Sequence, residues 1–379
     1  MSVIKIQKYD YIDALRGIAI LLVIIVHTSQ KVVPFNDLLR RLMSNGDKGV
    51  QLFYIVSALT LCFSLESRKG KESKYILYFF IRRFFRIAPL FYLAILFYQF
   101  PFDFHGNYYA PNGIKGWYIL SAATFTHGWH PETINSVVPG SWSIAVEYTF
   151  YLFLPFLFRL INNKEKAILF FIFTCIINCF ISNWIYSYWA NQYSKDLLYL
   201  AWGVSYYGFF NQLPVFAIGI LLFQFFKDKT FNNSRMTSIV LIILSFFLMY
   251  AYTDYCSYYN YINQLVMYAI AFALLTYAMA NRSFTLFVNP IAKFTGKISY
   301  GMYFIHFAIL DYFVGFNFWG LSRYGTYGTI IAILIVFLCT MFIATITYYL
   351  IEKNGVALGG HIISKLENNR ILKRNQIKS

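Results

Sequence analysis

Charged residues are few in this sequence of 379 residues. Only 13% are Asp, Glu, Lys or Arg, whereas a soluble globular chain contains about 25%. Acidic residues are the scarcer kind, with 16 Asp and Glu against 32 Lys and Arg. Because 59% of the residues are hydrophobic and the mean hydropathy is +0.53, the composition excludes a soluble protein. It predicts an all-α, polytopic integral membrane protein.

Cysteine is also scarce, and its positions form no recognisable pattern. Four of the five cysteines lie in apolar stretches and none belongs to a C-x-x-C pair, so we expect neither a disulfide framework nor a metal site. The positions are Cys62, Cys175, Cys179, Cys256 and Cys339. We also detect no low-complexity segment, no internal repeat and no appended soluble domain.

Long apolar stretches are abundant, and ten of them predict transmembrane helices. They cover residues 13–30, 49–65, 76–100, 142–161, 166–184, 209–226, 236–252, 262–280, 297–316 and 327–351. Most Lys and Arg then fall on the side of the membrane that holds the N-terminus. The exceptions are Lys31, Arg40, Arg41, Lys48, Lys115, Lys195 and Arg323. By the positive-inside rule, we expect both termini to be cytoplasmic.

The formal net charge of +16 could indicate a nucleic-acid-binding protein. The basic residues instead cluster at the ends of apolar stretches, so we expect no nucleic-acid partner. The basic tail at 356–379 is expected to lie against anionic lipid headgroups. The oligomeric state is left open.

The first apolar stretch carries two polar residues at different depths. Arg16 and His27 are eleven residues apart, which is roughly three helical turns, so both side chains point the same way about 16 Å apart along the axis. A charge in hydrocarbon costs on the order of 3 kcal/mol or more, so a functional role is expected for both. The pattern suits a long anionic substrate that is held at one face and used deeper in the membrane.

Three arginines gather at the start of the third apolar stretch, in F-F-I-R-R-F-F-R-I-A-P. Arg83 and Arg86 are three residues apart and share a helix face, with Arg82 beside them. Guanidinium groups bind phosphate oxygens in bidentate pairs, so the cluster predicts a phosphate-binding site. The alternative is snorkelling to the membrane boundary, which alone would explain one or two arginines.

A carboxylate lies inside the fourth apolar stretch. Glu147 ends the motif P-G-S-W-S-I-A-V-E, about one and a half turns into the expected helix. A carboxylate at this depth is costly, so we expect it to face a cavity or a cation and to have a functional role. The alternative is an ion pair with an arginine of another helix. Trp142 and Ser143 of the same motif are candidates for substrate contact or structural support.

The ninth apolar stretch carries a polar stripe. Tyr300, Tyr303 and His306 are spaced by three residues and so share one helix face, with His306 near mid-membrane. They are further candidates for substrate contact or structural support. For His306, a satisfied structural histidine is the commoner explanation.

The longest expected outer loop covers residues 101–140. It contains His105, His127 and His130, whose spacing does not match a metal site, so a surface role is expected for them. The aromatic segment 197–208 suits the outer membrane interface better than a transmembrane span.

These motifs, taken together and in this order, resemble the membrane-bound acyltransferase 3 family, whose members O-acylate bacterial cell-surface carbohydrates. The resemblance runs from Tyr9 to about Lys353. It rests on the Arg16-x10-His27 helix, G-V-Q-L-F-Y-I-V-S-A, R-R-F-F-R, S-W-S-I-A-V-E-Y-T-F-Y-L, K-I-S-Y-G-M-Y-F-I-H and Y-Y-L-I-E-K. It implies an acyltransferase 3 transmembrane domain at 1–355, followed by the cytoplasmic tail at 356–379.

The resemblance also implies the reaction. Acetyl-CoA would be the donor from the cytoplasm, a glycan hydroxyl the acceptor, and the bacterial inner membrane the location, with no tightly bound cofactor. From the residues themselves, we hypothesise that His27 acts as general base or transient acetyl carrier and that Glu147 orients His27 or stabilises its protonated form. The CoA phosphates would be held by Arg16, Arg82, Arg83 and Arg86.

Two other functional classes use the same residues differently. A transporter of a glycan or lipid precursor would use the intramembrane charges as a substrate path, but the sequence has no inverted repeat of the kind such folds show. A signalling or scaffold protein that has lost its chemistry would not be expected to keep Arg16, His27, Arg83, Arg86 and Glu147.

Overall fold

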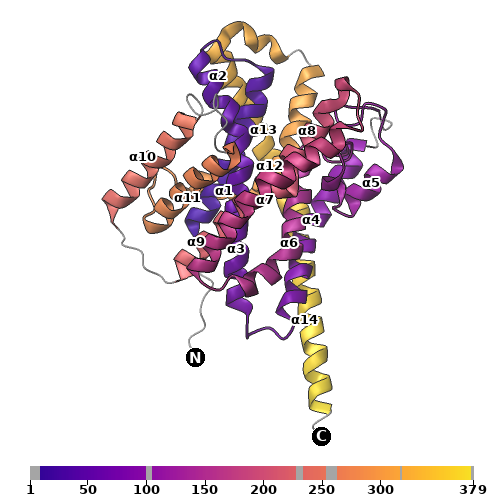
Figure 1. The fold of residues 1–379 in the computed structure, drawn as a ribbon, viewed down its shortest axis with the longest axis vertical. Helices are drawn as coiled ribbons and strands as arrows, with labels where there is room; N and C mark the ends of the chain where they lie inside the picture. The colour runs from indigo at the N-terminus through magenta and orange to yellow at the C-terminus, as the bar shows by residue number, and fades with distance from the viewer. Residues whose placement is uncertain (1–8, 100–104, 228–233, 253–262, 316–317, 377–379) are drawn as a thin grey trace.

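The computed structural model describes residues 9–99, 105–227, 234–252, 263–315 and 318–376, and these form a bundle of helices (Figure 1). Within them no strand occurs beyond one isolated bridge between Asn107 and Ala110, so the all-α prediction is confirmed for this part of the chain. The long helices are α1 (Asp10–Lys31), α3 (Gly49–Arg68), α4 (Tyr75–Gln99), α6 (Trp142–Leu160), α7 (Lys164–Ala190), α9 (Phe209–Lys227), α10 (Arg235–Ala251), α11 (Gln264–Asn281), α12 (Pro290–Gly315) and α13 (Gly325–Thr347).

Each of these helices overlaps one of the ten predicted ranges, with ends that differ by up to seven residues; residues 100, 262 and 316 lie outside the described residues. By length and composition alone, seven segments of the described chain could cross a membrane, and they contain α1, α3, α6, α7, α9, α11 and α13. Helix α4 carries three arginines, and α10 has only 17 residues. These apolar helices make the chain a multi-pass membrane protein. That it has ten transmembrane helices stays a prediction.

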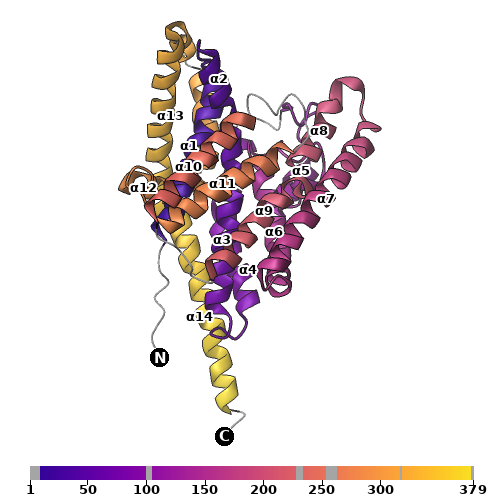
Figure 2. The ribbon, with the colours of Figure 1, turned by 60° about the vertical axis from the view of Figure 1, so that its left-hand side comes forward.

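Shorter elements connect the long helices. Opposite the chain termini lie α2 (Asp37–Ser44), α5 (Gly116–Ala123) and α8 (Leu198–Tyr207) (Figures 1 and 2). The 3₁₀ turns are η1 (Asn45–Lys48), η3 (His127–Trp129), η4 (Lys195–Leu197) and η6 (Phe318–Tyr324). The start of α1 and the end of α14 face the same end of the bundle, which is the arrangement expected if both termini share one side of a membrane (Figure 1). Their cytoplasmic location stays a prediction.

Helices α1 and α12 touch along their backbones because glycines face each other. A Cβ atom on Gly17 would lie 2.3 Å from the carbonyl oxygen of Ala292, and one on Gly296 would lie 1.7 Å from that of Asp13. No side chain fits in either place. This contact sets α1, which carries Arg16, against α12, which carries the Tyr300 stripe.

The chain stays helical beyond the end of α13. A π-helical turn, η7 (Tyr348–Glu352), joins it to α14 (Lys353–Gln376), which extends beyond the bundle (Figure 1). Helix α14 packs on α4, where Gly355 and Gly359 leave room for Phe85, and Glu367 accepts hydrogen bonds from Ser73 and Tyr78. The predicted tail therefore begins as a helix docked on the arginine-bearing helix.

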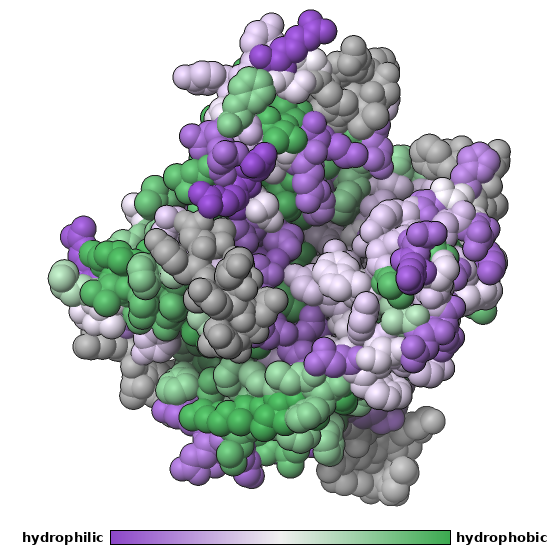
Figure 3. Space-filling view, turned by 45° about the horizontal axis from the view of Figure 1, so that its top comes forward, coloured by the Kyte–Doolittle hydropathy of each residue, from purple (hydrophilic) through white to green (hydrophobic). Residues whose placement is uncertain are grey.

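Apolar side chains cover the flanks of the bundle, as a lipid environment requires (Figure 3). Helix α7 is the most exposed of the candidate spans, with only 11% of its apolar window buried. Polar and weakly polar side chains gather across the middle of the face shown in Figure 3, between hydrophobic flanks that are drawn in green.

Candidate functional site

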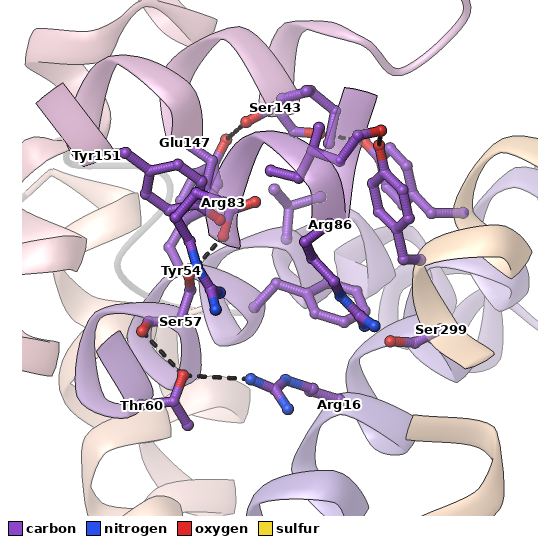
Figure 4. A pocket seen from close by; sticks show the side chains of 16 residues that line it. Arg16, Tyr54, Ser57, Thr60, Arg83, Arg86, Ser143, Glu147, Tyr151 and Ser299 are labelled. Atoms are coloured by element: carbon purple, nitrogen blue, oxygen red, sulfur yellow. Dashed lines mark hydrogen bonds between the residues drawn. The ribbon is translucent and has the colours of Figure 1, made fainter. Parts of the chain in front are cut away.

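Five helices enclose a polar pocket of about 120 Å³ inside the bundle (Figure 4). Helices α1, α3, α4, α6 and α12 each contribute to its wall. Seven of the residues predicted as site residues line it: Arg16, Arg83, Arg86, Ser143, Glu147, Tyr300 and Tyr303. Segments far apart in the sequence therefore meet around one space.

Helix α4 supplies two guanidinium groups to the pocket. Arg83 and Arg86, three residues apart, both line it, as expected for one helix face. Arg83 makes no ion pair within the described residues, and its Nε atom is buried without a hydrogen-bond partner. Arg86 Nη1 lies 3.8 Å from Oε2 of Glu352, whose side chain is fully buried. Snorkelling to the membrane boundary does not describe these two side chains, because they point into the protein.

Helix α1 supplies the third guanidinium group. Arg16 Nη2 donates to the hydroxyl of Thr60 at 3.2 Å (Figure 4). Its Nη1 lies 3.4 Å from the carboxylate of Asp13. The Arg16 side chain keeps 30% of its surface exposed, so it presents positive charge to the pocket. Three cations thus face one another, a costly arrangement that favours an anionic ligand.

Helix α6 supplies the carboxylate. Glu147 accepts hydrogen bonds from the hydroxyl groups of Ser57 and Tyr151. Within the described residues Glu147 forms no ion pair with an arginine. The structure therefore does not contain the interhelical ion pair that was the alternative explanation for this residue. No hydrogen bond joins it to His27 either. Glu147 instead sits in the arginine pocket and partly offsets its positive charge.

Hydroxyl groups line the upper part of the pocket. The Ser143 hydroxyl donates to the Tyr303 hydroxyl at 3.0 Å, and Tyr303 donates in turn to the carbonyl oxygen of Gly140, a residue with φ +78° just before α6. Tyr300 donates to the carbonyl oxygen of Ile87 at 2.9 Å. These predicted support residues therefore tie α12 to α4 and α6.

Four predicted site residues lie away from the pocket, and Arg82 and Trp142 are two of them. Arg82 makes a bidentate pair with Glu72, at 3.0 and 2.8 Å, on the other face of α4. Trp142 packs its ring against Tyr54 and Tyr207, with centroid distances of 6.4 and 4.5 Å. Arg82 is thus already neutralised by a partner, and Trp142 contributes packing.

His27 does not line the pocket either. Its Nδ1 donates to the carbonyl oxygen of Val23 at 3.0 Å and lies 3.4 Å from Nε2 of His306. A carbonyl can only accept, so Nδ1 carries the hydrogen and Nε2 keeps the basic lone pair. The fully buried His306 donates from its own Nδ1 to Met302 at 3.1 Å.

A layer of aromatic rings connects the pocket to His27. Tyr303, in the pocket wall, has its ring centroid 5.9 Å from that of His306 and 6.4 Å from that of Phe307. Phe307 in turn contacts His27, with centroids 4.6 Å apart. The predicted single chamber is therefore divided: the arginines and Glu147 share it, and His27 lies behind these rings.

Several lining residues were not predicted from the sequence. Tyr151 follows Glu147 by four residues, a spacing that places both on one helix face and could have indicated it. Ser57 and Thr60 are common residues in an apolar helix and gave no comparable signal.

One of the outer-loop histidines differs from expectation. His127, expected on the surface, is fully buried, and its Nε2 donates to the carbonyl oxygen of Ser141 at 3.0 Å. Burial lowers the pKa of His127 to about 4. Among the described residues, no three His, Cys, Asp or Glu side chains group as metal ligands would.

A family model described as "Acyltransferase domain" matches residues 9–349. The chain belongs to this acyltransferase family. The match covers every residue that lines the arginine pocket, together with His27 and His306.

Curated relatives of the chain carry acetyltransferase names. A protein of Staphylococcus aureus (strain COL) named "Putative O-acetyltransferase" is 26% identical over 341 residues, which cover 81% of this chain and 52% of that protein. "Putative acetyltransferase ORF330" of Acidianus two-tailed virus is 24% identical over 306 residues, covering 79% of this chain and 83% of its own length. The chain spans about half the length of the Staphylococcus relatives. No solved structure matches it.

Proposed function

We propose that the protein is a membrane O-acetyltransferase that moves an acetyl group from cytoplasmic acetyl-CoA to a hydroxyl group of a cell-surface or lipid-linked glycan. The observation that carries this proposal is the convergence of three guanidinium groups and one carboxylate in a single intramembrane pocket. Family membership and the names of the relatives support acyl transfer. Acetyl-CoA would then be a substrate, and the bacterial cytoplasmic membrane the location.

The donor phosphates would bind to Arg16, Arg83 and Arg86. Charge-assisted hydrogen bonds of this type contribute roughly 1.5–3 kcal/mol each. A pocket of about 120 Å³ is too small for a whole CoA molecule, so only the pyrophosphate region would enter it and the adenosine would stay outside. Glu147 would limit repulsion among the arginines when no donor is bound.

The thioester arm would extend from the pocket toward His27. Arg16 and His27 lie about 16 Å apart along α1, a span on the order of an extended pantetheine arm. To reach His27, the arm would have to displace the rings of Tyr303 and Phe307. The acceptor hydroxyl would arrive from the opposite end of the bundle.

His27 would act as general base through Nε2. It would remove the proton of the acceptor hydroxyl while the oxygen attacks the thioester carbonyl carbon. The new C–O bond forms, the C–S bond breaks, and the leaving thiolate takes the proton from the imidazolium. His306 would hold the Nδ1–H tautomer of His27 in place.

Transfer of label from acetyl-CoA tests the proposal. Membranes that contain the protein are incubated with acetyl-labelled CoA, and base-labile label is measured in the glycan fraction. We expect label with the wild type and about 10²- to 10⁴-fold less with His27→Ala. Equal label with both proteins would show that His27 is not the general base. No label with either protein would contradict the proposed acetyl transfer.

A further inference from the structure

Behind the arginine pocket lies a carboxylate that the proposed reaction does not use. Glu352, in the π-helical turn η7, is buried and does not line the pocket. Its Oε2 atom lies 3.8 Å from Nη1 of Arg86, which lines the pocket and keeps 34% of its side-chain surface exposed (Figure 4). Arg86 therefore stands between a buried anion of the protein and the space where the donor phosphates would bind.

Two local features place the Glu352 carboxylate beside Arg86. The π-helical turn η7 carries Glu352 at the point where α13 passes into α14, and π-helical turns are frequent at functional sites. On α12, a Cβ atom at Gly301 would lie 3.1 Å from Oε1 of Glu352. The glycine thus leaves the space that the carboxylate occupies.

The Glu352 carboxylate has a cation beside it but lacks hydrogen bonds. Neither of its oxygens accepts a hydrogen bond of good geometry from the described residues, although the backbone N–H of Gly301 lies close by. At 3.8 Å, Nη1 of Arg86 is also beyond hydrogen-bond distance. Because a buried carboxylate is costly without a cation, Glu352 depends on Arg86 for its neutralisation.

A purely structural role does not account for this arrangement. Glu367, on α14, is the comparison, because it accepts hydrogen bonds from Ser73 and Tyr78 and so docks α14 on α4. Within the part of the chain that the structure describes, Glu352 accepts no such bonds. A buried ion pair without them adds little stability compared with apolar residues of the same size. The position of Glu352 beside a pocket arginine therefore needs a functional explanation.

The charges around the empty pocket supply one. Arg16, Arg83 and Arg86 repel one another there, while the carboxylate of Glu147 is held by Ser57 and Tyr151. The second carboxylate attracts Arg86, and a bound phosphate would attract the same guanidinium group. Two anions beside one cation repel each other, so each weakens the binding of the other.

We propose that Glu352 positions Arg86 in the empty pocket and lowers the affinity of the pocket for acetyl-CoA, an inference that rests on the proposed function. The carboxylate occupies the place of a phosphate beside Arg86, and donor binding has to overcome this attraction. The product CoA carries the same phosphates as acetyl-CoA. Glu352 therefore also favours release of CoA after the acetyl group has been transferred.

Binding of labelled acetyl-CoA, CoA and pyrophosphate to the protein in nanodiscs tests this role. Glu352→Gln removes the charge at nearly constant shape, and Glu352→Met removes it without leaving a buried amide. We expect each variant to lower the Kd for all three ligands about fivefold or more, whereas loss of a merely structural residue would raise the Kd. An unchanged or higher Kd in a folded variant would overturn the proposal, as would failure of both variants to fold.

Two controls show whether Glu352 acts through Arg86. When Arg86→Gln is already present, adding Glu352→Gln should change the Kd for acetyl-CoA by less than about twofold, and the double variant leaves no buried charge without a partner. Glu367→Gln changes a carboxylate of α14 that does not line the pocket, and its Kd should also stay within about twofold of wild type. Tightening in either control as large as that in Glu352→Gln would contradict a specific role for the Glu352–Arg86 pair.

The outcomes separate this role from the proposed reaction. If Glu352→Gln tightens acetyl-CoA binding but the wild type transfers no acetate, the proposed reaction fails and the role of Glu352 stands. The same holds if only pyrophosphate binds and Glu352→Gln binds it more tightly. If acetate is transferred while the Kd for acetyl-CoA is unchanged in both Glu352 variants, the role of Glu352 fails and the reaction stands. Absence of binding of all three ligands would contradict both.

Discussion

Replacing Arg83 with Gln should weaken acetyl-CoA binding while leaving the helix bundle intact. Arg83 is the best arginine for this test because it lines the pocket and makes no ion pair within the described residues. Its removal therefore leaves no buried partner without a charge. Arg86 is a poorer choice, since its loss would strand the buried carboxylate of Glu352.

The size of the effect follows from the hydrogen bonds that are lost. One charge-assisted contact to phosphate is worth roughly 1.5–3 kcal/mol, and 1.4 kcal/mol corresponds to about tenfold in Kd. We expect the Kd for acetyl-CoA to rise about 10- to 150-fold in Arg83→Gln. Because Arg83 also stands opposite two other cations, relief of repulsion in the empty pocket should make the variant slightly more stable.

Binding of labelled acetyl-CoA to protein in nanodiscs measures this directly. Arg82→Gln is the matched control, because Arg82 is the preceding residue of α4 and carries the same charge, but is paired with Glu72 outside the pocket. We expect its Kd to stay within about threefold of wild type. A larger loss in Arg82→Gln than in Arg83→Gln would refute the assignment of the pocket as the phosphate site.

Three further results are expected. His27→Ala should lower the transfer rate by about 10²- to 10⁴-fold at an unchanged Kd for acetyl-CoA, measured in the same nanodiscs. Gly296→Ala should destabilise the protein by about 2 kcal/mol or more in detergent, because the new Cβ would meet the Asp13 carbonyl, whereas Gly360→Ala has open space around it. The free energy of unfolding should fall by about 2 kcal/mol between pH 7 and pH 5, because His127 becomes protonated when the chain unfolds.

The sign of the pH effect follows from the direction of the pKa shift. Folding lowers the pKa of His127 from 6.5 to about 4, so the unfolded chain binds the proton first and stability is lost as pH falls through this range. His127→Gln keeps a donor for Ser141 and should flatten the profile. An unchanged slope in that variant would assign the acid lability to other groups, and a Gly296→Ala protein as stable as Gly360→Ala would contradict the close helix contact.

Spacing within one helix was enough to predict which side chains share a face. Arg83 and Arg86 were expected together and lie together, because three residues make nearly one helical turn. Arg82 was predicted to bind the donor with them, but as the neighbouring residue it projects from another side of α4, where it pairs with Glu72. The positions of the long helices were also predictable, since apolar length determines them.

Contacts between helices could not be read in this way. Arg16 and His27 do point the same way from α1, but the rings of α12 cover the upper half of that face and leave only Arg16 in the pocket. Nothing in the spacing of α1 indicates which partner packs on it. Glu352 likewise appeared to end the last span, whereas the π-helical turn buries it beside Arg86.

Sidedness of the donor tests the central claim most directly. Sealed inside-out and right-side-out membrane vesicles are each given labelled acetyl-CoA, which does not cross a bilayer, and label in the glycan is counted. The account predicts transfer in inside-out vesicles only, because the arginine pocket would receive the donor from the end that carries the chain termini. Transfer confined to right-side-out vesicles, or equal transfer in both, would contradict it.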